Sequence, residues 1–164
     1  MTISEIHHVA LTVTDLDRSI AFYEQVLGFT KTLDLPLTGT ITERLLKLRL
    51  GTTGRSAILQ QSGKLTGSVE LIQFDPPAES RNGPKRPGDP GIFLLSFEVT
   101  GETLQEAHAR LRDRNIDCYE EPLELELKGY GRIQAIIFED PDGNMIELIQ
   151  LPSREAIRAY RAGR

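Results

Sequence analysis

Three residues of this chain, two glutamates and one histidine, have side chains of a type that can bind a cation. The tetrapeptide Glu-Leu-Ile-Gln occurs twice, beginning at Glu70 and at Glu147, 77 residues apart (147 − 70). In both copies a carboxylate stands inside an apolar strand, where a charge is costly unless it is paired or bound to a cation. His8 stands at the start of another apolar stretch. One imidazole and two carboxylates can bind a divalent metal ion, and this donor set does not select a single metal.

The alternation of side chains along a strand indicates which way these residues point. After His8, apolar residues recur at every second position beginning with Val9, the period of a half-buried strand. His8 is therefore expected on the face opposite Val9, and Glu70 and Glu147 opposite their apolar neighbours. The adjacent His7 is expected to point the same way as Val9, away from the site. All three candidate ligands are thus predicted to lie on sheet faces that the helices leave open.

The elements that position these residues also recur. Residues 8–29 and 92–117 each contain an alternating apolar stretch followed by an apolar stripe at helical spacing. Further strands are expected at residues 30–37, 43–50, 56–61 and 69–74 in the first half, and at 118–127, 133–139 and 145–151 in the second. The sequence therefore predicts an α+β fold built from two βαβββ modules.

The stretch between the two halves reads as a linker, because it is rich in Pro, Gly and charged residues. We expect the first module at residues 1–75, the linker at 76–91 and the second module at 92–164. The second module ends in a helix that begins near residue 153. Together the two modules are expected to form one structural domain.

Composition excludes several classes of protein. The 164 residues carry a formal net charge of −5 with mixed signs, which argues against a partner that is a nucleic acid or a membrane surface. No stretch approaches the roughly 20 apolar residues of a membrane helix, and no signal peptide precedes the first strand. The single cysteine, Cys118, excludes an internal disulfide and fits the cytoplasm.

Two longer motifs carry a family resemblance. The stretches HHVALTVTDLDRSIAFYEQVLGF near the start and FEDPDGNMIELIQ near the end, set in two βαβββ repeats, resemble the vicinal oxygen chelate superfamily. That superfamily includes glyoxalase I, methylmalonyl-CoA epimerase, extradiol dioxygenases and bleomycin-type resistance proteins, and the pattern is closest to glyoxalase I-like members. The resemblance implies that the two modules form an open, cup-shaped mixed sheet with helices on the convex side.

The resemblance also implies a ligand set. It implies that His8, Glu70 and Glu147 bind one divalent ion, and the ion can be Zn, Ni, Co, Mn or Fe. It also implies that Glu147 or Glu70 is the catalytic base. The fourth ligand position of the family falls on Ile92, which cannot bind metal. The loop with Tyr130 and Arg132 is similar to one that borders the cavity, with the roles of these two residues left open.

The resemblance implies a metal-dependent lyase, isomerase or epimerase that acts on a small oxygen-chelating substrate through a metal-stabilised enediolate. One alternative is an extradiol-type ring-cleaving dioxygenase, which usually has a second histidine ligand. The other is a metal-free drug-binding resistance protein, which would lack the inward-pointing ligands. A homodimer is expected, with the modules paired either within the chain or across the dimer.

Overall fold

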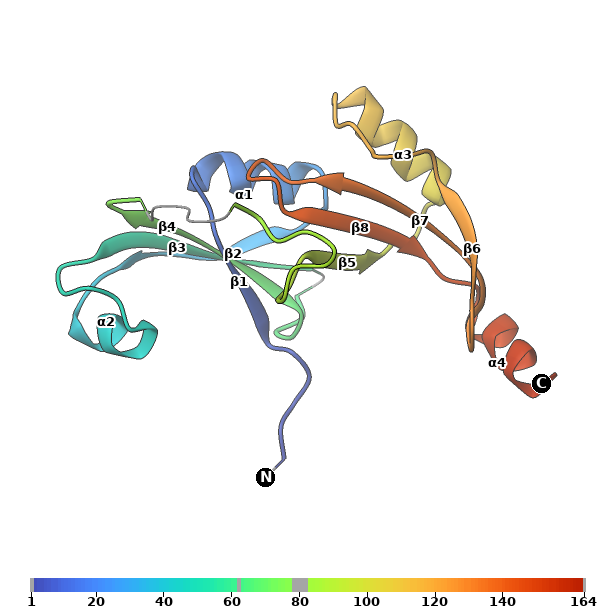
Figure 1. Ribbon diagram of the computed structural model, residues 1–164, viewed down its shortest axis with the longest axis horizontal. Coiled ribbons are helices and arrows are strands. Elements are labelled where there is room, and N and C mark those ends of the chain that lie inside the picture. The colour runs from blue at the N-terminus through green and yellow to red at the C-terminus, as the bar shows by residue number, and fades with distance from the viewer. Residues whose placement is uncertain (1, 62, 78–82, 164) are drawn as a thin grey trace. The chain divides into compact units, whose positions relative to one another are not determined.

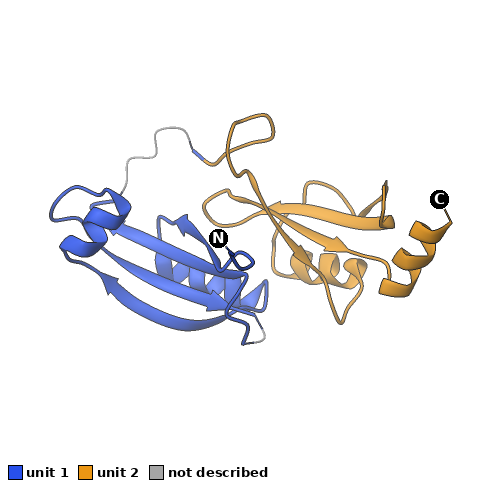
Figure 2. Cartoon of the chain, turned by 90° about the horizontal axis from the view of Figure 1, so that it is seen from below, with its two compact units in different colours: residues 1–83 blue, residues 84–164 orange. Residues whose placement is uncertain are grey.

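The computed structural model describes residues 2–61, 63–77 and 83–163 of the chain (Figure 1). The chain divides into two compact units, residues 1–83 and residues 84–164 (Figure 2). The division lies inside the stretch 76–91 that the sequence predicts as a linker, and the union of the two units into one structural domain stays a prediction. Among the described residues, no helix is both long and apolar enough to cross a bilayer.

Unit 1 contains, within its described residues, four strands and two helices. They are β1 (His8–Thr12), α1 (Leu16–Gln25), β2 (Thr30–Leu37), α2 (Thr40–Leu46), β3 (Thr53–Gln60) and β4 (Ser68–Asp75). The strand order is β1-β4-β3-β2, with β1 parallel to β4 and the other neighbours antiparallel. This is the predicted βαβββ order, with α2 added between β2 and β3.

Unit 2 repeats the plan without a counterpart of α2. Its elements are β5 (Leu94–Glu98), α3 (Leu104–Asp113), β6 (Leu123–Leu127), β7 (Gly131–Glu139), β8 (Met145–Gln150) and α4 (Arg154–Ala162). The strand order is β5-β8-β7-β6, with β5 parallel to β8. The predicted α+β class, with one mixed four-stranded sheet from each βαβββ repeat, is confirmed, and neither sheet closes on itself.

One face of each sheet is covered by a helix. In unit 1 the apolar stripe of α1 is buried, and so are Val69 and Leu71 on β4. Because successive residues of a strand point to opposite faces, Glu70 points away from that core. In unit 2 the stripe of α3 is buried, and so are Ile146 and Leu148, which flank Glu147. The two helices therefore leave free the faces that carry the glutamates, as the alternation predicts.

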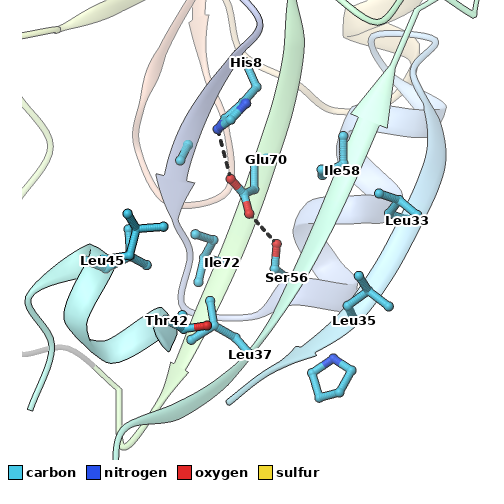
Figure 3. Close-up of a pocket in the computed structure, with 13 residues that line it drawn as sticks. His8, Leu33, Leu35, Leu37, Thr42, Leu45, Ser56, Ile58, Glu70 and Ile72 are labelled. Carbon is cyan, nitrogen blue, oxygen red and sulfur yellow. Dashed lines mark hydrogen bonds and ion pairs between the residues drawn. The ribbon is translucent and has the colours of Figure 1, made fainter. Parts of the chain in front are cut away.

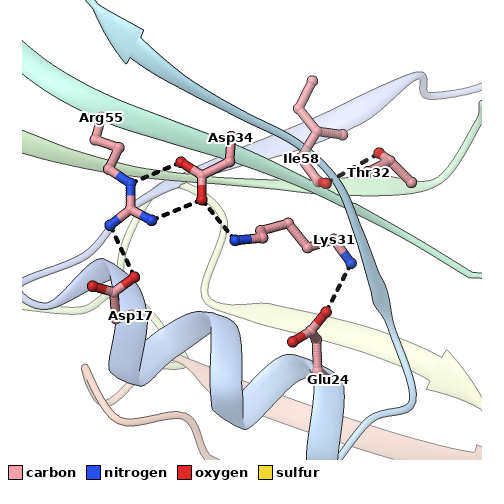
Figure 4. A network of polar contacts seen from close by, with 7 residues as sticks. All are labelled: Asp17, Glu24, Lys31, Thr32, Asp34, Arg55 and Ile58. Atoms are coloured by element: carbon pink, nitrogen blue, oxygen red, sulfur yellow. Dashed lines mark hydrogen bonds and ion pairs between the residues drawn. The ribbon is translucent and has the colours of Figure 1, made fainter.

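A charged network fastens α1 to the strands on the covered face of unit 1 (Figure 4). Arg55 on β3 donates two hydrogen bonds of 2.7 Å to the carboxylate of Asp34 on β2 and one of 2.8 Å to Asp17 on α1. The ammonium of Lys31 lies 2.7 Å from the same carboxylate of Asp34. These contacts hold the pKa of Asp34 well below its ordinary value, chiefly through the Arg55 hydrogen bonds, and raise the pKa of Arg55.

The strand predicted at residues 43–50 is wrong, because α2 and a loop occupy this segment. Leu46, Leu48 and Leu50 alternate with charged residues, which imitates a strand. In the structure Lys47 takes a left-handed conformation with φ of 54° and ends the helix. Leu50 is 84% exposed, so this alternation has no buried face behind it.

Glu43 anchors the end of α2. Its side chain is buried, and Oε1 accepts a hydrogen bond of 2.6 Å from the backbone N–H of Gly51. The carbonyl of Glu43 accepts a second hydrogen bond, of 2.8 Å, from the N–H of Leu48. Both bonds join the helix to the loop that follows it, and they therefore stabilise the end of α2.

In unit 2, β6 begins later than predicted, at Leu123 rather than at residue 118. Cys118 forms only an isolated bridge to Phe138 of β7. Pro122 stands directly before the strand and has no backbone N–H to donate to a ladder. The predicted strand was therefore too long at its start.

Candidate functional site

The sheet of unit 1 brings His8 and Glu70 together (Figure 3). His8 opens β1 and is paired in register with Ser68, and Glu70 lies two residues further along the neighbouring strand β4. Residues two apart on one strand share a face, so both side chains lie on the face opposite α1. His8 Nε2 is 3.3 Å from Glu70 Oε2. The sequence prediction that these two residues share a face agrees with this geometry.

Ser56 of β3 completes this polar group. Its hydroxyl donates a hydrogen bond of 2.6 Å to Glu70 Oε1, so the two carboxylate oxygens have different neighbours. Oε1 is held by the serine, whereas Oε2 faces the imidazole of His8. The sequence analysis missed Ser56, because finding it requires the register of β3 against β4, which places Ser56 opposite Ile72. The bond fixes the orientation of the glutamate toward His8.

The separation of 3.3 Å fits two atoms that share one metal ion. Ligand atoms at about 2.1 Å from an ion, and subtending about 90° to 109°, lie roughly 3.0–3.4 Å apart. Imidazole nitrogen and carboxylate oxygen are both accepted by Zn²⁺ and by neighbouring divalent transition metals. Within the described parts of the chain, no group of three or more His, Cys, Asp or Glu side chains is gathered as a metal site. His8 and Glu70 could therefore hold two positions of a metal site, and such a site would need further ligands.

His7 does not behave as predicted. Its ring packs edge-on against the ring of His8, with the centroids 5.2 Å apart, and the two Nδ1 atoms are 2.9 Å apart. The sequence prediction that His7 points away from the site is wrong, because β1 begins only at His8 and strand alternation does not extend to His7. An Nδ1–Nδ1 hydrogen bond requires one ring to donate and the other to accept. If His8 is the donor, its Nε2 carries the lone pair that faces Glu70.

Glu147 occupies in unit 2 the ladder position that Glu70 occupies in unit 1. Glu70 pairs with Ala10 of β1, and Glu147 pairs with Ser96 of β5. The hydroxyl of Ser96 donates a hydrogen bond of 2.5 Å to Glu147 Oε2. Both glutamates thus accept from a serine, although the serines come from different strands. The convergence of Glu147 with His8 and Glu70 stays a prediction.

The same register corrects the fourth ligand position. Val9 pairs with Val69, and Leu95 pairs with Ile146, so the counterpart of His8 in the second repeat is Leu94 and not Ile92. Ile92 lies before β5 and is 68% exposed. Leucine cannot bind metal either, so the second repeat contributes no histidine at this position.

A pocket of about 450 Å³ lies over His8 and Glu70 on the open face of unit 1 (Figure 3). Leucines of β2 form one wall, and α2 forms another through Thr42, Leu45 and Leu46. The volume is within the range of small-molecule sites. This helix therefore lies on the same side of the sheet as the candidate ligands, which departs from the prediction that the helices lie on the convex side. The sequence missed α2 as a wall because residues 43–50 read as a strand.

Tyr130, which directly precedes β7, and Arg132, which lies in β7, make local contacts within unit 2. The guanidinium of Arg132 is 79% exposed and lies 3.4 Å from Glu124. The guanidinium of Arg161 lies over the ring of Tyr130, at 5.3 Å from its centroid. These contacts tie the loop to β6 and α4, and a role in substrate binding stays open for both residues.

A second polar cluster lies on the face of unit 2 that carries Glu147. Glu139 accepts hydrogen bonds from the hydroxyl of Tyr119, at 2.5 Å, and from Arg86, at 2.8 Å. These bonds, chiefly the one from Tyr119, lower the pKa of Glu139, and the same bond raises the pKa of the Tyr119 hydroxyl. The cluster connects residues 84–91 to β7, and its charges compensate each other.

Comparisons with known proteins agree with the fold. The sequence profile of the Glyoxalase/Bleomycin resistance protein/Dioxygenase superfamily matches residues 5–148. Virulence protein STM3117 of Salmonella typhimurium is 30% identical over 150 residues, which cover 92% of this chain and 86% of that protein. A 2-epi-5-epi-valiolone epimerase of an Actinomyces species is 29% identical over 150 residues, 90% of this chain and 80% of the epimerase.

Among solved structures, a glyoxalase family protein of Bacillus cereus aligns with a TM-score of 0.77 at 18% identity. The alignment covers 93% of this chain and 97% of that protein. At this identity the likeness concerns the fold alone. It indicates that the arrangement of strands and helices described above is that of a known fold.

Proposed function

Because this chain belongs to the Glyoxalase/Bleomycin resistance protein/Dioxygenase superfamily, we propose that it is a metal-dependent enzyme that moves a proton next to a carbonyl group. Isomerases, epimerases and lyases of this kind share that step. The curated epimerase that is 29% identical to this chain supports the reaction class. The substrate class would be small molecules that present two neighbouring oxygen atoms.

The observation that carries the proposal is the contact between His8 Nε2 and Glu70 Oε2, 3.3 Å apart at the floor of the unit 1 pocket. Partial burial of a carboxylate beside an imidazole costs desolvation free energy. Ionisable groups in such surroundings cluster at functional sites. We assign His8, Glu70 and Glu147 as ligands of one divalent ion. That ion supplies Lewis-acid stabilisation of negative charge on a substrate oxygen.

Side chains of this protein would orient and supply the general base. Ser56 holds one oxygen of Glu70 and leaves the other directed toward His8. A carboxylate with a fixed orientation is suited to accept a proton from a carbon atom within hydrogen-bonding reach. Glu70 is one candidate for this general base. Glu147 is the other, since Ser96 orients it in the same manner.

The second candidate function is a metal-free binding protein. The apolar lining of the unit 1 pocket favours it, because such a lining retains an apolar ligand without help from a metal. A ring-cleaving dioxygenase has less support. Its usual ligand set contains two histidines and one carboxylate, whereas the assigned set has one histidine and two glutamates.

Metal content tests the leading proposal. Purified protein is incubated separately with Zn²⁺, Ni²⁺, Co²⁺, Mn²⁺ and Fe²⁺, desalted and analysed for bound metal. We expect one ion per chain in the wild type. We expect a loss of most of that metal in His8→Ala and in Glu147→Gln, because each variant removes one donor atom from the first coordination sphere.

Glu124→Gln is the matched control for Glu147→Gln. Glu124 is an exposed carboxylate of the same unit that pairs with Arg132, so this variant should retain the full metal content. The proposal fails if the wild type binds no metal at saturating concentration, or if His8→Ala retains all of it. In either case the metal-free binding protein becomes the better candidate.

A further inference from the structure

The pocket above His8 and Glu70 has an uneven chemical lining. Seven of its thirteen lining residues are leucine or isoleucine, and Ala10 and Pro36 are apolar as well. The four polar residues are His8, Glu70, Ser56 and Thr42. The first three form the hydrogen-bonded group described above. A ligand in this pocket would therefore meet a polar floor at one place and aliphatic walls elsewhere.

Among the described residues that line the pocket there is no arginine or lysine. The two cations on the neighbouring strands, Lys31 and Arg55, lie on the covered face and are bound to Asp34 (Figure 4). An anionic group placed between the leucines would lose its hydration without gaining a partner of opposite charge. The pocket thus disfavours phosphate, sulfate or carboxylate groups along its walls.

In the described part of the chain, the imidazole of His8 is also the one aromatic side chain that lines the pocket. A flat ring would find no tyrosine, phenylalanine or tryptophan on which to stack. Aliphatic walls instead accommodate a saturated chain or a branched alkyl group, for which contact area matters more than ring geometry. The lining therefore favours aliphatic over aromatic ligands.

Several leucines that form the walls of the pocket are exposed to solvent. Leu35 is 54% exposed, Leu45 is 78% exposed and Leu46 is 45% exposed. Adjacent exposed apolar side chains that line one hollow mark a binding site more often than single scattered ones do. In unit 2, Leu123 and Leu125 of β6 are exposed too, at ladder positions equivalent to those of Leu35 and Leu37.

We propose that the unit 1 pocket holds an uncharged aliphatic group of the substrate. The substrate would then combine a head group with two neighbouring oxygens, placed at His8 and Glu70, with a saturated apolar tail between β2 and α2. This inference rests on the proposed function for the head group only. The tail site is defined by the leucines and stands without a metal.

Alkyl hydroxamates test both the head-group site and the tail site. Their head group chelates metal through two neighbouring oxygens, and their alkyl chain can be varied in length. Acetohydroxamate, butyrohydroxamate, hexanohydroxamate and octanohydroxamate are titrated calorimetrically into protein loaded with the divalent ion that it binds. We expect the affinity to rise about fourfold for each methylene that enters the pocket. The monohydroxamate of suberic acid has the carbon count of octanohydroxamate but ends in a carboxylate. It should bind no better than butyrohydroxamate.

Leu45→Asp and Leu50→Asp form a matched pair of variants. Both leucines are highly exposed and lie in or just after α2, so neither substitution removes a buried side chain. Only Leu45 lines the pocket. Leu45→Asp should weaken octanohydroxamate about tenfold or more and leave acetohydroxamate unchanged. Leu50→Asp should bind both as the wild type does.

The outcomes separate the tail from the head group. Metal-dependent binding with no effect of tail length, or equal binding by the two aspartate variants, overturns the tail site and leaves the proposed function standing. If acetohydroxamate binds equally well with and without the divalent ion, the proposed function is overturned. The tail site is then decided by 1-octanol and 1-butanol, which have no chelating head group. Stronger binding of octanol to the wild type than to Leu45→Asp, measured by saturation-transfer NMR, supports it, and equal binding overturns it.

Discussion

His8 has a neighbour at each of its ring nitrogens. Nε2 faces Glu70 at 3.3 Å, and Nδ1 lies 2.9 Å from Nδ1 of His7. A histidine that binds metal through one nitrogen commonly donates from the other, which fixes its tautomer and orientation. His7 is therefore suited to hold the ring of His8 in the state that presents a lone pair to a metal.

The first prediction at this scale is that His7→Ala weakens metal binding without abolishing it. Loss of an outer partner of a ligand histidine commonly costs about 10-fold to 100-fold in metal affinity. The ring of His8 would remain, so metal should still bind at a higher concentration. Competition with a chelator of known affinity measures the difference. His7→Gln, which keeps a side-chain acceptor, should recover part of the loss.

An affinity for metal in His7→Ala equal to that of the wild type would contradict this role. His7 would then be a surface residue that happens to touch His8. A complete loss of metal would contradict it as well, because His7 would then itself be a ligand.

Sequence alone could place His8, Glu70 and Glu147 on the open faces of their sheets, because their orientation follows from strand parity and from a duplicated tetrapeptide. It could not place Ser56 or Ser96. Their contacts depend on which residues stand opposite each other across two strands, and this register follows from turns and loops whose geometry the sequence does not display. The counterpart of His8 was assigned two residues too early, to Ile92, for the same reason.

At the scale of elements, the network of Asp34, Arg55 and Asp17 joins β2, β3 and α1. Because the pKa of Asp34 is lowered in the folded state, folding favours its ionised form. Its contribution to stability is complete above the ordinary carboxyl pKa of about 3.9. It is lost as the pH falls from there through the lowered pKa of the folded protein.

The second prediction is that Asp34→Asn destabilises unit 1 by about 1 kcal/mol at neutral pH, the size expected for a partly exposed charge network. The difference from the wild type should shrink as the pH is lowered below about 4. Urea denaturation at several pH values measures it. Glu120→Gln, at an exposed carboxylate in unit 2, is the control for a general effect of removing a carboxylate. A difference that stays constant down to the lowest pH would contradict the assigned role of the ionised Asp34.

Elements with a buried face were predictable, and α2 was not. The apolar residues of α1, α3 and the inner strands β3, β4, β7 and β8 recur with the period of the element because a core lies on one side of them. Residues 43–50 have apolar residues without such a core, and several of them face solvent or the pocket. The spacing of these apolar residues does not mark a face that packs on a core. The prediction of a strand assumed such a face and was therefore wrong.

At the scale of the whole molecule, the proposed ligands come from two units. In this proposal the site is completed either within one chain or between two chains. A mixture of His8→Ala and Glu147→Gln variants distinguishes these cases. A dimer with exchanged units would regain an intact site in each mixed pair, whereas sites formed within single chains would each keep one defect. Recovery of metal binding in the mixture therefore identifies exchange.

The last prediction is that the protein forms a homodimer. In the described residues, β1, β2, β5 and β6 each pair along one edge only, which leaves four strand edges for contacts with other chains. Several large apolar residues outside the unit 1 pocket are also exposed: Ile3, Ile6, Ile41, Leu50 and Ile92. Burial of such surface between two copies removes apolar area from water. Sedimentation equilibrium at micromolar concentration should give twice the 18.3 kDa of the chain. A mass of one chain across that range would contradict the dimer, and it would also require every metal site to be completed within a single chain.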